Sequence, residues 1–97
     1  MLNEKVDVEI YGRTLTIEIE GLQQLEINAL ANKVDKRMRE LTQETDIVDS
    51  SKLAILTALE FAADGQKLKS KMEDMQRIQD RSLEDMIAKL EQGLIHP

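Results

Sequence analysis

Hydrophobic residues keep a helical spacing through most of the second half of the chain. From Asp49 to Gln92 there is no proline, and this stretch takes up almost half of the 97 residues. At a rise of 1.5 Å per residue, such a helix would be on the order of 60 Å long, about twice the diameter of a small domain. The remaining residues are too few to cover it. We therefore expect its apolar stripe to be buried by another copy of the chain or by another protein.

Alternation of apolar and polar residues characterises the start of the chain. From Lys5 to Ile19 the pattern has a period of two and is rich in β-branched residues, which predicts two half-buried strands. Between them lies Tyr11-Gly12-Arg13, short enough for a tight hairpin in which Gly12 takes a positive φ. The face to be buried carries Val6, Val8, Ile10, Leu15, Ile17 and Ile19. A lone hairpin is only marginally stable in water, so we expect a helix to cover this face.

The next segment supplies that helix. From about Gln24 to Thr45, apolar residues recur every three or four positions, as in an amphipathic helix. Its apolar stripe is formed by Ile27, Leu30, Val34, Met38 and Leu41. Charged residues lie on an adjoining polar face, where solvent exposure is the common case: Lys33, Lys36, Arg37 and Glu40. The connector that follows ends in good N-cap candidates for the long helix: Asp49, Ser50 and Ser51.

The long helix changes character at Gly65. Before it, apolar residues lie on several sides, so we expect packing on the hairpin, on the first helix and on a second subunit. After it, the predicted oligomerisation surface is a single seam formed by Leu68, Met72, Met75, Gln79, Leu83, Met86 and Leu90. From Met72 to Leu94 the steps are 3-4-4-3-4-4, an eleven-residue repeat that predicts a nearly straight or weakly right-handed coil. Ile78 and Ile87 widen the seam and favour more than two helices.

Two glycines bear on where this coil begins and ends. Gly65 costs about 1 kcal/mol against Ala inside a helix, so it is either a soft point or tolerated without a role. Gly93 is well placed to end the helix as its C′ residue. We therefore predict a compact head at residues 1–64 and a coiled-coil tail at residues 65–97. The fold would be α+β, with the hairpin packed on the short helix and on the start of the long one.

Charge and composition argue against several classes of function. Residues 1–64 hold seven Lys/Arg against 13 Asp/Glu, whereas residues 65–97 hold six of each. An acidic head argues against nucleic-acid binding, which depends on a surplus of basic residues. The lack of a long apolar run argues against a membrane span and a signal peptide, so we expect a cytoplasmic protein.

The sequence also lacks the residues of a reactive site. There is no cysteine, and the single histidine, His96, is next to the last residue, so no metal site is predicted. No glycine-rich phosphate-binding motif is present. The carboxylates fall on faces predicted to be exposed, which do not shift a pKa as a general acid requires. We expect neither an enzyme nor a cofactor.

Three stretches resemble the ZapA family of bacterial cell-division proteins. They are V-D-V-E-I-Y-G-R at 6–13, N-A-L-A-N-K-V-D-K-R-M-R-E-L at 28–41 and I-V-D-S-S-K-L-A-I-L-T-A-L at 47–59. In this order and at these separations they are specific. The resemblance covers residues 6–64 in register, whereas the tail is similar only in character. Within this stretch Glu60 departs from the family's common pattern, and so does Gly65 just beyond it.

The resemblance implies a non-enzymatic protein that binds FtsZ, the tubulin-like GTPase of the division ring, and that bundles, cross-links or stabilises its filaments at mid-cell. It also implies a dimerising head and, in longer members, two dimers packed through their coils into a tetramer. Arg13 matches a basic position of the family's head motif and is the first candidate for an FtsZ contact. FtsZ, as a family, is acidic, so Lys33, Lys36 and Arg37 are further candidates.

Two questions stay open at this point. A dimer and a dimer of dimers would both bury the seam of the tail. A generic coiled-coil adaptor, whose head binds an unrelated protein, is the alternative to an FtsZ-binding protein. A pelleting assay with purified FtsZ filaments distinguishes these two functions.

Overall fold

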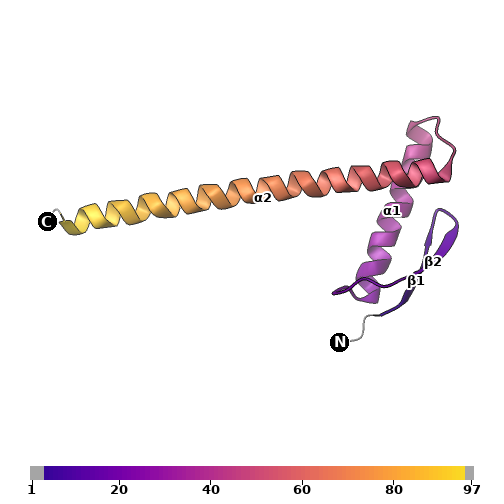
Figure 1. Cartoon of the computed structure of the whole chain (residues 1–97), viewed down its shortest axis with the longest axis horizontal. Coiled ribbons are helices and arrows are strands. Elements are labelled where there is room, and N and C mark those ends of the chain that lie inside the picture. The colour runs from indigo at the N-terminus through magenta and orange to yellow at the C-terminus, as the bar shows by residue number, and fades with distance from the viewer. Residues whose placement is uncertain (1–3, 96–97) are drawn as a thin grey trace. The chain divides into compact units, whose positions relative to one another are not determined.

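The computed structural model describes residues 4–95, which form a β-hairpin followed by two helices (Figure 1). The elements are β1 at Val6–Ile10, β2 at Arg13–Ile17, α1 at Gln24–Glu44 and α2 at Ser50–Ile95. Contacts divide the described chain into a first unit that ends at Glu60 and a second unit that starts at Phe61, both of which include part of α2. The predicted α+β fold and its order of elements are confirmed.

The hairpin turn consists of two residues with positive φ. Tyr11 and Gly12 have φ values of 51° and 77°, as the two central residues of a type I′ turn require. This turn fits the right-handed twist of the antiparallel strands that it joins. The predicted positive φ at Gly12 is confirmed. Arg13, predicted within the turn, is instead the first residue of β2, because it pairs with Ile10 of β1.

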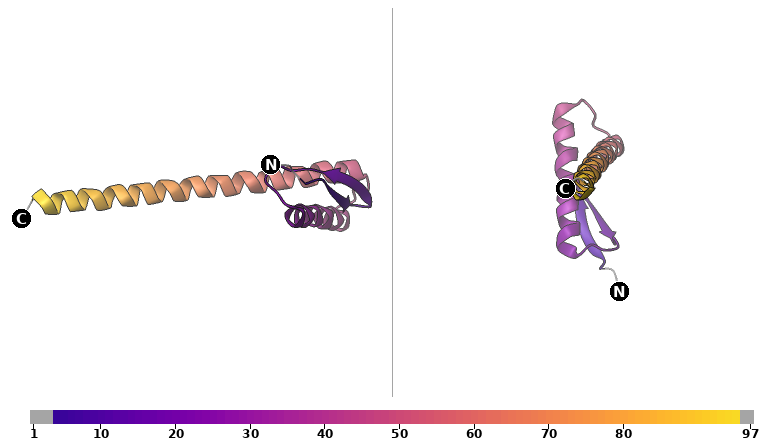
Figure 2. Two further views of the ribbon diagram at one scale, coloured as in Figure 1. Left: turned by 90° about the horizontal axis from the view of Figure 1, so that it is seen from below. Right: turned by 90° about the vertical axis from the view of Figure 1, so that its left-hand side faces the viewer.

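One hydrophobic cluster lies where the hairpin runs beside α1 (Figures 1 and 2). Its buried members are Val6, Val8, Ile27 and Ala31, and Ile10, Ile17 and Leu22 pack against them. The strand that contacts α1 is β1, so the apolar face of β2 is only partly covered. Leu15 is therefore 49% exposed, contrary to the prediction. Leu30 was also predicted to be buried but is 46% exposed, and the adjacent Ala31 is buried instead.

A second cluster joins α1 to the start of α2. It is formed by buried Met38, Leu41 and Leu53, with Ile10, Tyr11, Val34, Ile47 and Leu56 packed against them. Thr57 is also buried, and its hydroxyl donates a hydrogen bond to the Leu53 carbonyl at 2.7 Å. Among residues 4–95, this part of α2 is covered on one side, and the predicted packing on several sides is not complete. On another side, Ile55 and Leu59 are 62% and 63% exposed.

The predicted start of α2 is confirmed, whereas its predicted end is not. The carboxylate of Asp49 accepts hydrogen bonds from the backbone N–H groups of Ser51 at 2.8 Å and Lys52 at 3.3 Å, which confirms it as the N-cap. The predicted end at Gly93 is wrong, because α2 continues to Ile95 and Gly93 does not take a positive φ. His96 lies outside the described residues.

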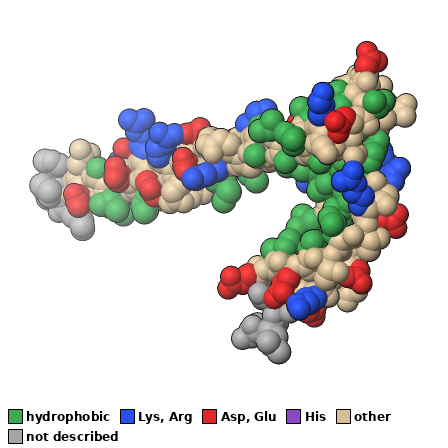
Figure 3. Space-filling model, turned by 45° about the vertical axis from the view of Figure 1, so that its right-hand side comes forward, with side chains coloured by type: hydrophobic (Ala, Val, Ile, Leu, Met, Phe, Trp, Pro, Cys, Tyr) green, Lys and Arg blue, Asp and Glu red, His purple; other side chains and the backbone are tan. Residues whose placement is uncertain are grey.

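The second unit buries little of its own surface. Every side chain from Ala62 to Gln92 is exposed, and hydrophobic side chains recur at intervals along it between charged ones (Figure 3). This is expected of an isolated helix, which has no second layer against which to bury its stripe. No helix within residues 4–95 combines the length and the apolar character needed to cross a membrane.

Candidate partner-binding site

The hairpin turn is fixed to α1 by polar contacts. The backbone N–H of Tyr11 donates to Asp35 Oδ1 at 2.7 Å, and its hydroxyl lies 3.1 Å from Thr42 Oγ1. Arg39 donates from Nε to Asp35 Oδ2 at 3.0 Å, and its guanidinium carbon lies 5.5 Å from the centre of the Tyr11 ring. That distance is within the range of a cation–π contact. These hydrogen bonds, first from Arg39 and then from Tyr11, lower the pKa of Asp35 and keep it charged.

Arg13 follows this turn and reaches the start of α2. Its Nη2 donates a hydrogen bond to Ser50 Oγ at 2.7 Å, across 37 positions of sequence. Ser50 is the first residue of α2 and comes directly after the N-cap Asp49. The contact therefore connects the end of the hairpin to a capped helix start, and the Arg13 side chain itself is exposed.

A depression of about 340 Å³ lies next to this contact, and we refer to it as the hairpin groove. It is lined by Ile10, Tyr11, Arg13, Leu15, Met38, Ser50, Ser51, Ala54 and Ile55. Most of these side chains are apolar, and two of them, Leu15 and Ile55, are among the exposed hydrophobic residues of the first unit. Arg13 adds a positive charge to this lining. The arrangement is suited to a partner that presents an apolar side chain next to a carboxylate.

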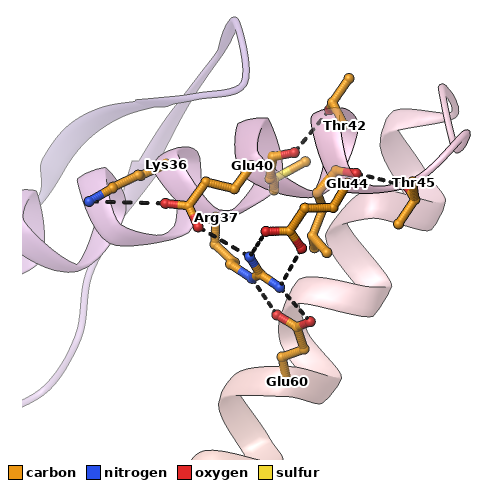
Figure 4. A network of polar contacts seen from close by, with 9 residues as sticks. Lys36, Arg37, Glu40, Thr42, Glu44, Thr45 and Glu60 are labelled. Carbon is orange, nitrogen blue, oxygen red and sulfur yellow. Dashed lines mark hydrogen bonds and ion pairs between the residues drawn. The ribbon is translucent and has the colours of Figure 1, made fainter.

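Arg37 lies in a different environment, between α1 and α2 of the first unit (Figure 4). Its Nε and Nη2 donate to the two carboxylate oxygens of Glu60 at 2.6 and 2.9 Å, a bidentate pair. Its Nη1 also donates to Glu40 and Glu44, each at 3.1 Å. Glu60, followed by Glu44, raises the pKa of Arg37, and Arg37 in turn lowers the pKa of Glu60. Three carboxylates thus surround one guanidinium.

The four basic residues predicted to contact a partner do not form one cluster of contacts. Lys36 and Arg37 share Glu40, which Lys36 approaches to 4.0 Å, whereas the hydrogen bond of Arg13 goes to Ser50. The Lys36 side chain is 80% exposed, and that of Arg37 only 25%. Lys33 is exposed on α1.

Sequence reasoning missed the partners of these arginines. Ser50 was recognised only as a cap candidate, and Glu60 only as a departure from a family pattern. Arg37 and Glu60 are separated by 23 positions and belong to different helices. Pairs at such separations leave no periodic signal, because periodicity reports which residues share a face of one element. The departure at position 60 was the only indication available.

The seam predicted in the tail is exposed to solvent. Its six apolar members expose between 57% and 67% of their surface: Leu68, Met72, Met75, Leu83, Met86 and Leu90. Gln79 is exposed as well, and Ile78 and Ile87 beside the seam are 68% and 47% exposed. This is a long apolar surface without a cover among the described residues of the chain.

The hairpin groove and the seam both fall within a stretch that matches a known family. The family model described as Cell division protein ZapA matches residues 6–94, which include both surfaces. The chain belongs to the ZapA family. The predicted resemblance is thereby confirmed, and the match extends through the tail, where the sequence motifs alone had shown only a similar character.

Individual ZapA proteins agree with this assignment. The chain is 38% identical over 72 residues to the Cell division protein ZapA of Bacillus pumilus, which covers 74% of this chain and 84% of the relative. It is 37% identical over 73 residues to that of Bacillus subtilis, covering 75% and 85%. Its fold is similar to a ZapA mutant dimer from Geobacillus stearothermophilus, with a TM-score of 0.66 and 33% identity over 84% of this chain and 90% of that one. Sequence and fold thus point to the same ZapA family.

Proposed function

We propose that this protein binds FtsZ filaments and cross-links them at the division site as a homo-oligomer with several binding units. The observation that carries the proposal is the uncovered seam of the second unit, from Leu68 to Leu90. A long apolar stripe in water is stabilised by association, because burying it removes apolar surface from solvent. Copies joined through this seam would each contribute one first unit. Binding by linked units raises avidity without any new contact.

The seam is proposed to join first two and then four chains. The similarity to a Geobacillus protein whose structure is described as a dimer supports association of this chain with itself. Ile78 and Ile87, both exposed beside the seam, widen the apolar surface beyond what a two-helix contact covers. Ile55 and Leu59 offer further apolar surface on the first unit for pairing of heads. A dimer of dimers would use both kinds of surface.

The FtsZ contact is proposed at the hairpin groove, with Arg13 as its principal residue. The chain carries a net charge of −6, so an acidic partner must be met by a local basic group. Lys33 and Lys36 on α1 are the supporting candidates. Arg37 is the weakest of the four, because three carboxylates already balance its charge. Contacts between exposed charges are screened by salt, so binding should weaken as ionic strength rises.

The proposed role needs no reaction. It requires only that a binding surface be repeated in one assembly, and it assigns no catalytic residue, metal or cofactor. Its place of action would be the cytoplasmic division ring at mid-cell, where FtsZ filaments lie. The name of the family, Cell division protein ZapA, is in keeping with this location.

Co-sedimentation with purified FtsZ filaments tests the proposal. The wild-type chain should pellet with filaments, and Arg13→Glu should lose most of this binding while its oligomeric state stays unchanged. Lys5→Glu makes the same change of charge at an exposed position of the first unit and should bind as the wild type does. Undiminished pelleting of Arg13→Glu would remove Arg13 from the site. A wild-type chain that never pellets would leave the adaptor function in its place.

A further inference from the structure

Among the described arginines of the first unit, Arg13 alone has no carboxylate partner. Arg37 is held by three carboxylates, and Arg39 by Asp35. Arg13 donates to the hydroxyl of Ser50 and, among the described residues, forms no ion pair and no other hydrogen bond. A carboxylate would neutralise a guanidinium, whereas a hydroxyl accepts one N–H and leaves the positive charge in place.

The hydroxyl of Ser50 lies at a capped and well-packed end of α2. Ser50 begins α2 directly after the N-cap Asp49, whose carboxylate holds two backbone N–H groups of the first turn. One turn further on, Leu53 is fully buried in the second hydrophobic cluster. The backbone at Ser50 is therefore held by packing and capping that do not depend on Arg13.

An arginine that is already held in one orientation loses less side-chain entropy when it binds a partner. A free arginine side chain populates many rotamers, and binding must select one of them. Arg13 is already held at the hairpin groove by its bond to Ser50, and most of its five N–H donors remain available. A partner carboxylate would thus meet a cation whose orientation is set before binding.

We propose that Ser50 is a positioning residue for Arg13. Its hydroxyl orients the guanidinium at the rim of the hairpin groove without neutralising it, so that Arg13 can receive a carboxylate of the partner. The proposal rests on the proposed function, in which Arg13 contacts FtsZ. It assigns no direct contact with the filament to Ser50.

Removal of the hydroxyl gives the first test. Ser50→Ala should weaken binding to FtsZ filaments about three- to tenfold, the range expected when one long side chain must be ordered on binding. Ser50→Thr keeps the hydroxyl and should bind as the wild type does. The matched control is Ser70→Ala, since Ser70 is an exposed residue of α2 outside the hairpin groove and the seam, and its hydroxyl makes no hydrogen bond among the described residues. If Ser50→Ala fails to fold, Ser50→Val against Ser50→Thr makes the same comparison at equal shape.

A double-mutant cycle separates this inference from the function on which it rests. In an Arg13→Ala background, Ser50→Ala should have no further effect on binding. If Ser50→Ala binds as tightly as the wild type, or weakens binding equally in both backgrounds, Ser50 does not act through Arg13 and the inference is wrong while the function stands. If Arg13→Ala alone leaves binding unchanged, the proposed function of Arg13 is wrong and the inference falls with it.

A carboxylate at position 50 distinguishes positioning from a purely structural link. Asp is favourable in the first turn of a helix, and it would pair with Arg13 more strongly than a hydroxyl does. Ser50→Asp should therefore keep or raise the thermal stability of the first unit and yet lower FtsZ binding more than Ser50→Ala does. A purely structural role predicts unchanged binding whenever stability is kept, and that result would overturn the proposal.

Discussion

At the residue scale, the group that faces each guanidinium decides what the arginine can do. Arg37 has three carboxylate partners and a side chain that is only 25% exposed, so its interactions are made within the first unit. Arg13 has one neutral partner and an exposed side chain. Substitutions at Arg37 should therefore act on stability, whereas those at Arg13 should act on binding. Sequence alone could not separate these two, because the local pattern does not say which residue distant in the sequence faces each guanidinium.

The ion pair of Glu60 with Arg37 predicts how stability depends on pH. Because Arg37 lowers the pKa of Glu60 in the folded state below its ordinary 4.5, the carboxylate stabilises the fold above that value. This contribution is lost as pH falls through the lowered pKa. Glu60→Gln should melt at a lower temperature than the wild type at neutral pH, and the difference should be small at an acid pH that protonates Glu60 in the folded state. Thermal unfolding at one fixed chain concentration measures both.

The control for this prediction is an exposed glutamate outside the network. Glu20→Gln removes the same charge at a position with no hydrogen bond or ion pair to a side chain among the described residues. It should leave the melting temperature nearly unchanged at both pH values, as most exposed substitutions do. A difference for Glu60→Gln that persists at low pH would mean that packing, and not charge, holds Glu60 in place.

At the element scale, the sequence predicted each helix and strand but not how they cover one another. The alternation in Val6–Ile10 and the spacing in Gln24–Glu44 specify element types, because period two and period 3.6 each define a face. Neither period says which strand a helix lies on. α1 contacts β1, so Leu15 on β2 stays half exposed and becomes part of the hairpin groove. The site could not be predicted because it depends on this packing and on the bond from Arg13 to Ser50.

Replacing glycine by alanine should have opposite effects on stability in the hairpin turn and in α2. At Gly12, φ is 77° and the space that a methyl group would enter is open, so Gly12→Ala would suffer backbone strain alone and should destabilise by about 1–2 kcal/mol. Gly65 lies inside α2, also with nothing within 4 Å, so Gly65→Ala should stabilise by about 1 kcal/mol. Chemical denaturation of the two variants checks the signs. Stabilisation by Gly12→Ala would contradict the turn assignment. If Gly65→Ala is stable but no longer bundles filaments, the flexibility of the helix at Gly65 has a role in bundling.

At the scale of the whole molecule, two surfaces have to act together. In the proposed function the hairpin groove would hold one partner and the seam would join copies of the chain, but neither surface would cross-link filaments by itself. Residues 1–64 carry the entire net charge of −6, whereas residues 65–97 are balanced. Charge repulsion therefore opposes pairing less along the tail than between heads. The seam is for this reason the surface expected to hold the assembly together.

A charge placed in the seam should uncouple binding from cross-linking. Met86 is a seam residue that is 59% exposed in the single chain, and a buried glutamate at its position would be left without a partner after association. Met86→Glu should lower the oligomeric state measured by sedimentation equilibrium while the first unit stays folded. Each chain should still bind FtsZ filaments, but more weakly, because linked binding units gain about 10²–10⁴ in avidity.

The bundling assay then decides whether assembly is the mechanism. Low-speed pelleting, which collects bundles but not single filaments, should show a loss of bundling for Met86→Glu. Ala88→Glu makes a similar change on the opposite side of the same helix, at an exposed position, and should bundle as the wild type does. If Met86→Glu were found as a single chain and still bundled filaments, one first unit would have to touch two filaments at once. The seam would then serve some purpose other than cross-linking, and a second binding surface would have to be sought on the first unit.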